Sequence, residues 1–252
     1  MVQPIRKVAV LGAGVMGQGI AAHLANSGIP SILFDIVPRD LAEGEHRSKT
    51  ARAGIANAAK LKPAAFYRKD LASMIEPANY DDDGARLAEC QLIIEVVVER
   101  LDIKHHVFRW VAEHRSPGSI VASNTSGLKL ADMVAPMSEE MRAHFLITHF
   151  FNPVRYMRLL ELVTGPDTHQ EVIDAVARFG EKVLGKGIVF AKDTPNFIAN
   201  RIGTYGICSV FSHMESLEMT PEEVDTALSG AVGRPRLGVF GLGDLVGLDT
   251  LV

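Results

Sequence analysis

Gly12-Ala13-Gly14-Val15-Met16-Gly17 directly follows the apolar run Val8–Leu11, and the rest of the sequence is best understood from this junction. The run predicts a buried strand, and residues 16–26 predict a helix that ends at Gly28. Glycines at this spacing allow a tight turn, close approach of a pyrophosphate and close packing of helix on strand. The positive helix N-terminus attracts phosphate, so we expect a dinucleotide site formed by Gly12, Gly14, Val15, Met16 and Gly17.

A second predicted strand, Ser31–Asp35, ends in a carboxylate at the usual distance from the glycines. At that place Asp35 can accept hydrogen bonds from the adenosine ribose and repel a 2′-phosphate, which favours NAD over NADP. Arg39 lies four residues further on and could meet such a phosphate. The alternative role for Asp35 is that of a helix N-cap.

The amino-acid composition limits the classes of protein to which the chain can belong. The chain has 252 residues, 47% of them apolar and 22% charged, which is typical of a globular protein with its own core. Its net charge of −4 gives no basic excess for nucleic acid or an anionic membrane surface. Cys90 and Cys208 cannot form a disulfide framework, which favours the cytoplasm. No apolar run approaches the ~18 residues of a membrane span.

The first three quarters of the chain alternate short apolar strands with helical patterns. This alternation predicts the α/β class, with a Rossmann-type, mostly parallel sheet and helices on both faces. The further predicted helices are residues 39–60 and Leu101–His114. The further predicted strands are residues 92–97, 119–123 and Phe145–Phe150, followed by antiparallel additions at 157–163 and 188–191.

The pattern after Pro195 is purely helical. Residues 197–217 and 221–228 predict two helices, the second with Thr220 as its N-cap. We therefore expect an NAD-binding domain at 1–193 and a smaller all-helical domain at 194–252. The last residues, 247–252, look like the start of a helix, so we expect the helical domain to be incomplete and the chain to be part of a longer protein.

Polar side chains follow several predicted strand ends, where α/β sheets place their chemistry. His149 ends one strand, and Glu161 lies on the returning strand, so a hairpin can bring the two together as a general base with a fixed tautomer. A hydrogen-bonded core histidine is the alternative. Ser126 ends a polar run that could hold a substrate oxygen or the nicotinamide, and Asn200 lies one turn into the first helix of the second domain.

Two further patterns imitate known ligand sites. Residues 180–186 match G-x-x-x-x-G-K but are followed by Gly187, which has no hydroxyl for Mg²⁺. Residues 79–84 imitate the start of a calcium loop, but Cys90 stands where a bidentate Glu is required. We interpret the second pattern as a solvated turn and predict no metal.

These motifs resemble those of the L-3-hydroxyacyl-CoA dehydrogenase family, in its order and near its spacing. The residues that carry the resemblance are Gly12–Gly17, Ile94–Glu99, Ser123–Ser126, His149–Pro153 with Met157 and Glu161, Asp193–Arg201, and Val246–Asp249. The resemblance implies an NAD-dependent oxidoreductase of fatty-acid β-oxidation that acts on an acyl-CoA. It is strongest to the dehydrogenase part of bacterial fusions with an enoyl-CoA hydratase. The family often dimerises through its helical domain.

The resemblance also assigns roles to residues. His149 takes the proton of the 3-hydroxyl group while hydride leaves for NAD⁺, and Glu161 pairs with His149. Ser126 and Asn200 line the reacting oxygens. The expected cofactor contacts include four residues outside the glycine turn: Asp35, Glu99, Lys104 and Asn152.

Two departures, one unassigned contact and two alternatives remain open. The departures are Asn196, which stands where the family usually has glycine, and a slightly longer spacing from Ser126 to His149. The CoA phosphates have several candidate partners: Lys49, Lys60 and Lys62. One alternative is another β-hydroxyacid-type dehydrogenase with a lysine base, although no lysine occurs between Thr194 and Thr220. The other is a module that binds NAD without turnover, which would not need a His–Glu pair.

Overall fold

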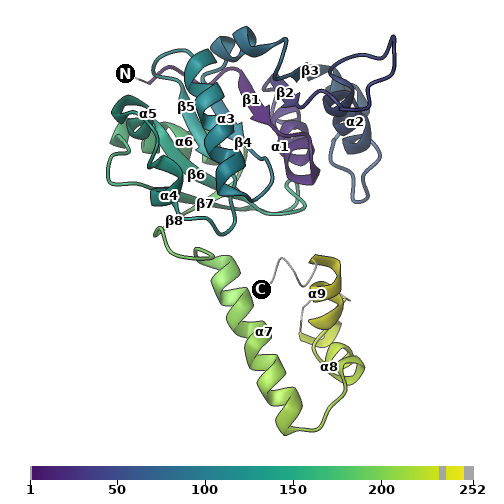
Figure 1. The fold of residues 1–252 in the computed structure, drawn as a ribbon. Helices are drawn as coiled ribbons and strands as arrows, with labels where there is room; N and C mark the ends of the chain where they lie inside the picture. The colour runs from purple at the N-terminus through teal and green to yellow at the C-terminus, as the bar shows by residue number, and fades with distance from the viewer. Residues whose placement is uncertain (1, 233–236, 247–252) are drawn as a thin grey trace. The chain divides into compact units, whose positions relative to one another are not determined.

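The computed structural model describes residues 2–232 and 237–246 (Figure 1). Its contacts divide the chain into two units, residues 1–197 and 198–252. The predicted helical start at 247–252, and most of the motif Val246–Asp249, lie outside the described residues.

One eight-stranded sheet forms the first unit, in the order β3-β2-β1-β4-β5-β6-β7-β8. Its strands are β1 (Val8–Leu11), β2 (Ser31–Asp35), β3 (Ile75–Asn79), β4 (Leu92–Glu95), β5 (Ile120–Ser123), β6 (Phe145–Phe150), β7 (Leu159–Thr164) and β8 (Gly187–Ala191). The first six are parallel to one another. β7 runs antiparallel to β6, and β8 runs parallel to β7. The predicted mostly parallel sheet with antiparallel additions is therefore confirmed.

Helices cover both faces of this sheet (Figure 1). They are α1 (Val15–Asn26), α2 (Lys49–Ala58), α3 (Leu101–His114), α4 (Leu130–Val134), α5 (Glu139–Ala143) and α6 (Gln170–Lys182). Alternate residues of β1 belong to two separate apolar clusters, since successive side chains of a strand point to opposite faces. Val8 and Val10 lie in the cluster that includes residues of α1 and α6, whereas Ala9 and Leu11 lie in the cluster that includes residues of α3 and α4.

The structure differs from the sequence prediction at two places between β2 and β4. The helix expected over residues 39–60 begins only at Lys49, because residues 42–47 are exposed and Gly44 has a φ of +83°, so this part has no apolar face to bury. β3 was not predicted at all. Pro77 lies in its middle, and proline in a strand is tolerated at a sheet edge, which is where β3 lies.

The second unit consists of α7 (Ala199–Ser216), α8 (Pro221–Ala227), the short 3₁₀ turn Gly230–Val232 and α9 (Phe240–Val246). Thr220 is the N-cap of α8, as the sequence predicts, and the structure adds a capping box with Glu223. Asp225 then accepts hydrogen bonds from the amide of Val239, just before α9, at 2.6 Å and from that of Phe240, the first residue of α9, at 2.9 Å. Within the described ranges, we find no helix long and apolar enough to cross a membrane.

His23 on α1 leads to a prediction about acid stability. Its Nε2 lies 2.9 Å from the carbonyl of Leu184, and burial together with the nearby Lys186 lowers the pKa of His23 to about 4. Between pH 4 and 6.5 the unfolded chain therefore binds a proton that the native protein does not. We expect the free energy of unfolding to fall by up to about 3 kcal/mol over this range.

Urea denaturation between pH 6.5 and 4.5 measures this contribution. In His23→Gln the loss of stability with falling pH should be shallower, because glutamine keeps a donor for Leu184 but does not titrate. An unchanged pH dependence in that variant would contradict the assignment.

Candidate active site

The glycine-rich turn between β1 and α1 has the shape that a dinucleotide requires. Gly12 has a φ of +119°, and a Cβ there would lie 2.6 Å from the carbonyl oxygen of Val96. A Cβ on Gly17 would lie 1.8 Å from the carbonyl oxygen of Gly12, so α1 can pack this closely only with glycine. A Cβ on Gly14 would have no neighbour within 4 Å. Open space thus lies in front of the α1 N-terminus, where a pyrophosphate fits.

This difference between Gly14 and Gly17 predicts that the effect of a substitution on NAD binding can be separated from its effect on stability. Gly14→Ala should weaken NAD binding roughly tenfold or more, because its methyl group enters the open space. The free energy of unfolding should change by less than about 1 kcal/mol, the usual range for a cap position. Calorimetric titration with NAD and urea denaturation measure the two effects. Gly17→Ala is the matched control, for which we expect a large loss of stability; equal NAD affinity in Gly14→Ala and the wild type would contradict the placement.

Asp35 ends β2 beside this turn. Its Oδ2 accepts a hydrogen bond from the amide of Ala13 at 2.6 Å, and its Oδ1 accepts one from the amide of Ile36 at 2.7 Å. The N-cap of the next helix is Ser48, so Asp35 does not have the alternative role of a helix N-cap. Its carboxylate lies at the carboxyl edge of the sheet, where a ribose contact remains a prediction.

His149 and Glu161 face each other across the β6–β7 hairpin. They are direct partners in the antiparallel register, and the Nδ1 atom of His149 lies 2.8 Å from Oε2 of Glu161. Both side chains are buried, with exposed fractions of 3% and 0%. The hairpin therefore fixes the imidazole with Nδ1 toward the carboxylate and leaves Nε2 to act on another group.

The Nε2 atom of His149 points toward the loop after β5. It lies 3.2 Å from the hydroxyl of Ser126, which is exposed. The rings of Phe151 and Phe197 lie against the imidazole, at centroid distances of 4.3 and 5.5 Å. A small polar group that binds beside Ser126 would thus contact Nε2 of His149. The carboxylate of Glu161 and the rings of Phe151 and Phe197 hold this imidazole in place.

A buried ion pair supports the same edge of the sheet. Nζ of Lys104 lies 2.8 Å from Glu95, and their side chains are 1% and 0% exposed. Lys104 also lies 3.2 Å from Glu99, and the hydroxyl of Ser123 donates to Glu95 at 2.5 Å. The sequence does not identify Glu95 as the partner of Lys104. Glu95 interrupts an apolar strand, and any other polar residue at this position would give the same pattern.

Glu99 connects this ion pair to the loop that carries Ser126. Its Oε1 accepts hydrogen bonds from the amides of Ser126 at 2.9 Å and Gly127 at 3.2 Å, and from the hydroxyl of Thr125. Burial opposes its ionisation, but Lys104 and these donors hold the pKa of Glu99 below its ordinary value. A continuous set of polar contacts therefore leads from Glu95 to Glu161.

The set of contacts described above does not include the remaining predicted residues. Asn152 is exposed in the turn that follows β6, and Asn200 lies in the first turn of α7, in the second unit. Lys49 pairs with Glu45 at 2.5 Å, while Lys60 and Lys62 are exposed. Their expected contacts with substrate or cofactor stay predictions.

The departure at Asn196 has a conformational explanation. Asn196 has a φ of +63° and Phe197 a φ of +45°, so the backbone here is left-handed at two successive residues. Glycine is the usual residue in this conformation, and asparagine is among the few others that tolerate it. Phe197 is 2% exposed and packs on His149, which offsets the strain at this position.

Comparisons with known proteins show which family the chain matches. Residues 7–194 match the family described as 3-hydroxyacyl-CoA dehydrogenase, NAD binding domain, and residues 197–252 match its C-terminal domain. The "Probable 3-hydroxyacyl-CoA dehydrogenase" of Bacillus subtilis is 49% identical over 98% of this chain. The "Putative fatty acid oxidation complex trifunctional enzyme" of Rickettsia felis is 39% identical over 100% of it. The chain spans about a third of the length of these two relatives, 33% and 34%.

A solved structure gives the same result at the level of the fold. The crystal structure of M. tuberculosis FadB2 superposes with a TM-score of 0.83 at 30% identity, covering 99% of this chain and 85% of that one. Its agreement extends over both units of the chain, and the matched first domain is one that binds NAD. The chain belongs to the 3-hydroxyacyl-CoA dehydrogenase family.

Proposed function

We propose that this chain oxidises L-3-hydroxyacyl-CoA to 3-ketoacyl-CoA with NAD⁺, and that His149 is the general base. The observation that carries the proposal is the buried His149–Glu161 contact of 2.8 Å, with Ser126 at the other imidazole nitrogen. A module that only binds NAD has no need for this arrangement. A base held near a polar binding position is what the oxidation of an alcohol requires.

The residues of the chain divide the work as follows. Nδ1–H of His149 donates to Glu161, so Nε2 is unprotonated and accepts the proton of the 3-hydroxyl group. NAD⁺, when bound, supplies the hydride acceptor for C3. The carboxylate of Glu161 stabilises the imidazolium that forms, and the hydroxyl of Ser126 binds the oxygen that becomes the ketone. In the reverse direction the imidazolium returns the proton.

The cofactor residues have separate proposed roles. Gly12, Gly14 and Gly17, with the amides of Val15 and Met16, hold the pyrophosphate, and Asp35 binds the adenosine ribose. Glu99 and Asn152 are further contacts of the cofactor. Because Lys104 is buried between two carboxylates, it acts by orienting Glu99 rather than through its own surface.

We further propose the setting in which the reaction takes place, which is β-oxidation of fatty acids in the cytoplasm. The Rickettsia relative is named as a trifunctional enzyme of a fatty acid oxidation complex, which supports fusion to further modules, and the family resemblance makes an enoyl-CoA hydratase the expected one. A homodimer through the helical unit is supported by large apolar side chains exposed on α7, among them Ile202, Tyr205 and Phe211. Asn200, on the same helix, binds the reacting oxygen.

The test is the formation of NADH from NAD⁺ and L-3-hydroxybutyryl-CoA or longer L-3-hydroxyacyl-CoA, with the D-isomers as controls. We expect turnover with the L-isomers alone. An otherwise intact protein that binds NAD but oxidises none of these substrates would contradict the proposal and favour a binding module. A second check is the NAD affinity of the same preparation, which separates loss of the site from loss of chemistry.

A further inference from the structure

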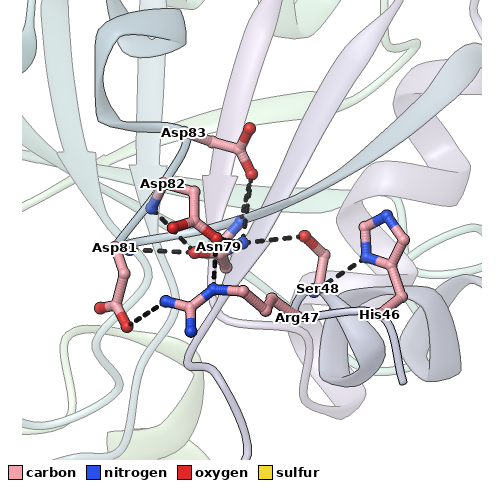
Figure 2. Close-up of polar contacts among 7 residues, drawn as sticks. All are labelled: His46, Arg47, Ser48, Asn79, Asp81, Asp82 and Asp83. Atoms are coloured by element: carbon pink, nitrogen blue, oxygen red, sulfur yellow. Dashed lines mark hydrogen bonds and ion pairs between the residues drawn. The ribbon is translucent and has the colours of Figure 1, made fainter. Parts of the chain in front are cut away.

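A hydrogen-bonded acidic turn follows β3, the edge strand beside β2 (Figure 2). Asn79 organises it: its Oδ1 accepts from the amides of Asp81 at 3.1 Å and Asp82 at 2.9 Å. The carboxylate of Asp83 in turn accepts from the amide of Asn79 at 2.9 Å. The turn that imitates a calcium loop is thus fixed by its own hydrogen bonds, and the described residues contain no group of metal-ligating side chains large enough for a metal.

Arg47 is held by this turn (Figure 2). Its Nε donates to Asp82 at 2.6 Å and a terminal nitrogen donates to Asp81 at 3.1 Å. These contacts raise the pKa of Arg47 and lower that of Asp82. The neighbouring residue, Ser48, accepts a hydrogen bond from the Nδ2 of Asn79 at 3.1 Å, so the backbone at Arg47 is fastened to the end of β3.

The end of β3 lies directly beside Asp35. Asn79 and Asp35 are register partners in the parallel β2–β3 pair, and neighbouring strands lie about 4.8 Å apart. The proposed ribose position is therefore next to the segment that carries Arg47. An arginine near the ribose is the group by which dinucleotide folds accept a 2′-phosphate, because its planar guanidinium binds two phosphate oxygens.

We propose that Asp81 and Asp82 make the site selective for NAD by holding Arg47 in ion pairs and away from a 2′-phosphate. The inference rests on the proposed ribose contact of Asp35. Asp35 repels the phosphate, and the acidic turn removes the cation that would otherwise attract it. Arg39, which is exposed on the segment after β2, is the competing cation.

The double variant Asp81→Asn/Asp82→Asn tests this. Asparagine at 82 can still accept from Asn79, and the backbone amides at 81 and 82 still donate to it, so the turn is kept while the charges are lost. We expect the affinity for NADP⁺ to rise roughly tenfold, the value of one charge-assisted hydrogen bond. The affinity for NAD⁺ should stay the same. Both dissociation constants are measured by calorimetry, without turnover.

Three further variants determine whether Arg47 is responsible. Adding Arg47→Gln to the double variant should abolish the rise in affinity for NADP⁺, whereas adding Arg39→Gln should leave that rise intact. Asp83→Asn changes the same charge in the same turn at a residue that bonds Asn79 instead of Arg47, so NADP⁺ affinity should change little.

Several results would overturn the inference. One is that the affinity for NADP⁺ does not rise in the double variant. Another is that it still rises when Arg47→Gln is added, and a third is that it rises equally in Asp83→Asn. If Asp35→Ala leaves the affinities for both cofactors unchanged, the proposed ribose contact itself is wrong. If instead the double variant binds NAD⁺ normally and its affinity for NADP⁺ does not rise, only the role of Asp81 and Asp82 is wrong.

Discussion

His149→Gln is expected to lower turnover by about 10²–10⁴-fold, the usual contribution of a positioned general base. Glutamine is close to histidine in size and can still bond Glu161, so the fold should remain. It cannot accept the hydroxyl proton at neutral pH. NAD affinity should be unchanged, because the glycine turn and Asp35 belong to other strands of the sheet. Steady-state oxidation of an L-3-hydroxyacyl-CoA and calorimetric titration with NAD measure the two quantities.

Glu161→Gln is the matched variant for the partner. It keeps the shape of the side chain but removes the charge that faces the imidazole, so the imidazolium formed during oxidation loses its stabilisation. Turnover should fall, though the nitrogen that accepts the proton is still present. Near-normal turnover in His149→Gln would refute the role of this pair even in a true family member.

The second large effect concerns stability. Lys104→Met should lower the free energy of unfolding by about 3–5 kcal/mol, because it leaves the charge of Glu95 buried without a partner. Urea denaturation measures this loss. The exposed pair of Arg100 and Asp102, at the start of the same helix, supplies the control, since Arg100→Met should have little effect.

The same ion pair allows a compensating test. In Lys104→Met/Glu95→Leu neither charge remains, and burial of two apolar side chains should restore much of the lost stability. The hydrogen bonds that Glu95 accepts from the hydroxyl of Ser123 and the amide of Val97 are lost in this variant as well. If the double variant is no more stable than Lys104→Met, then an uncompensated charge is not the reason for the loss.

The sequence alone predicts the sheet because its signals are local. Val8–Leu11 is a continuous apolar run that ends before Gly12, and Phe145–Phe150 is a mostly apolar run that ends shortly before Asn152-Pro153. Both strands are found at those positions. β3 escapes prediction because Pro77 and Glu76 interrupt its apolar pattern, which only an edge position tolerates. The helix over residues 39–60 was predicted too long because charge alone does not distinguish an exposed helix from an exposed loop.

Parts of the candidate site depend on pairings that are not local. His149 and Glu161 could be placed together because a hairpin connects them. Glu95 and Lys104 meet across a strand and a helix, and no spacing rule identifies Glu95 as a partner. The burial of Lys104 is therefore visible only in the structure, and it is the reason we propose an indirect role for Lys104 at the cofactor. The left-handed backbone at Asn196 is likewise visible only in the structure.

The β6–β7 hairpin also bears on how relatives of this chain can diverge. His149 and Glu161 are partners through the strand ladder, so the length of the connection at 151–158 does not set their distance. Insertions there could reshape the surrounding surface and alter the range of accepted substrates without disturbing the pair. A deletion of one residue within β7 would instead turn Glu161 to the opposite face. Variation in length is thus tolerable in the loop and intolerable in the strand.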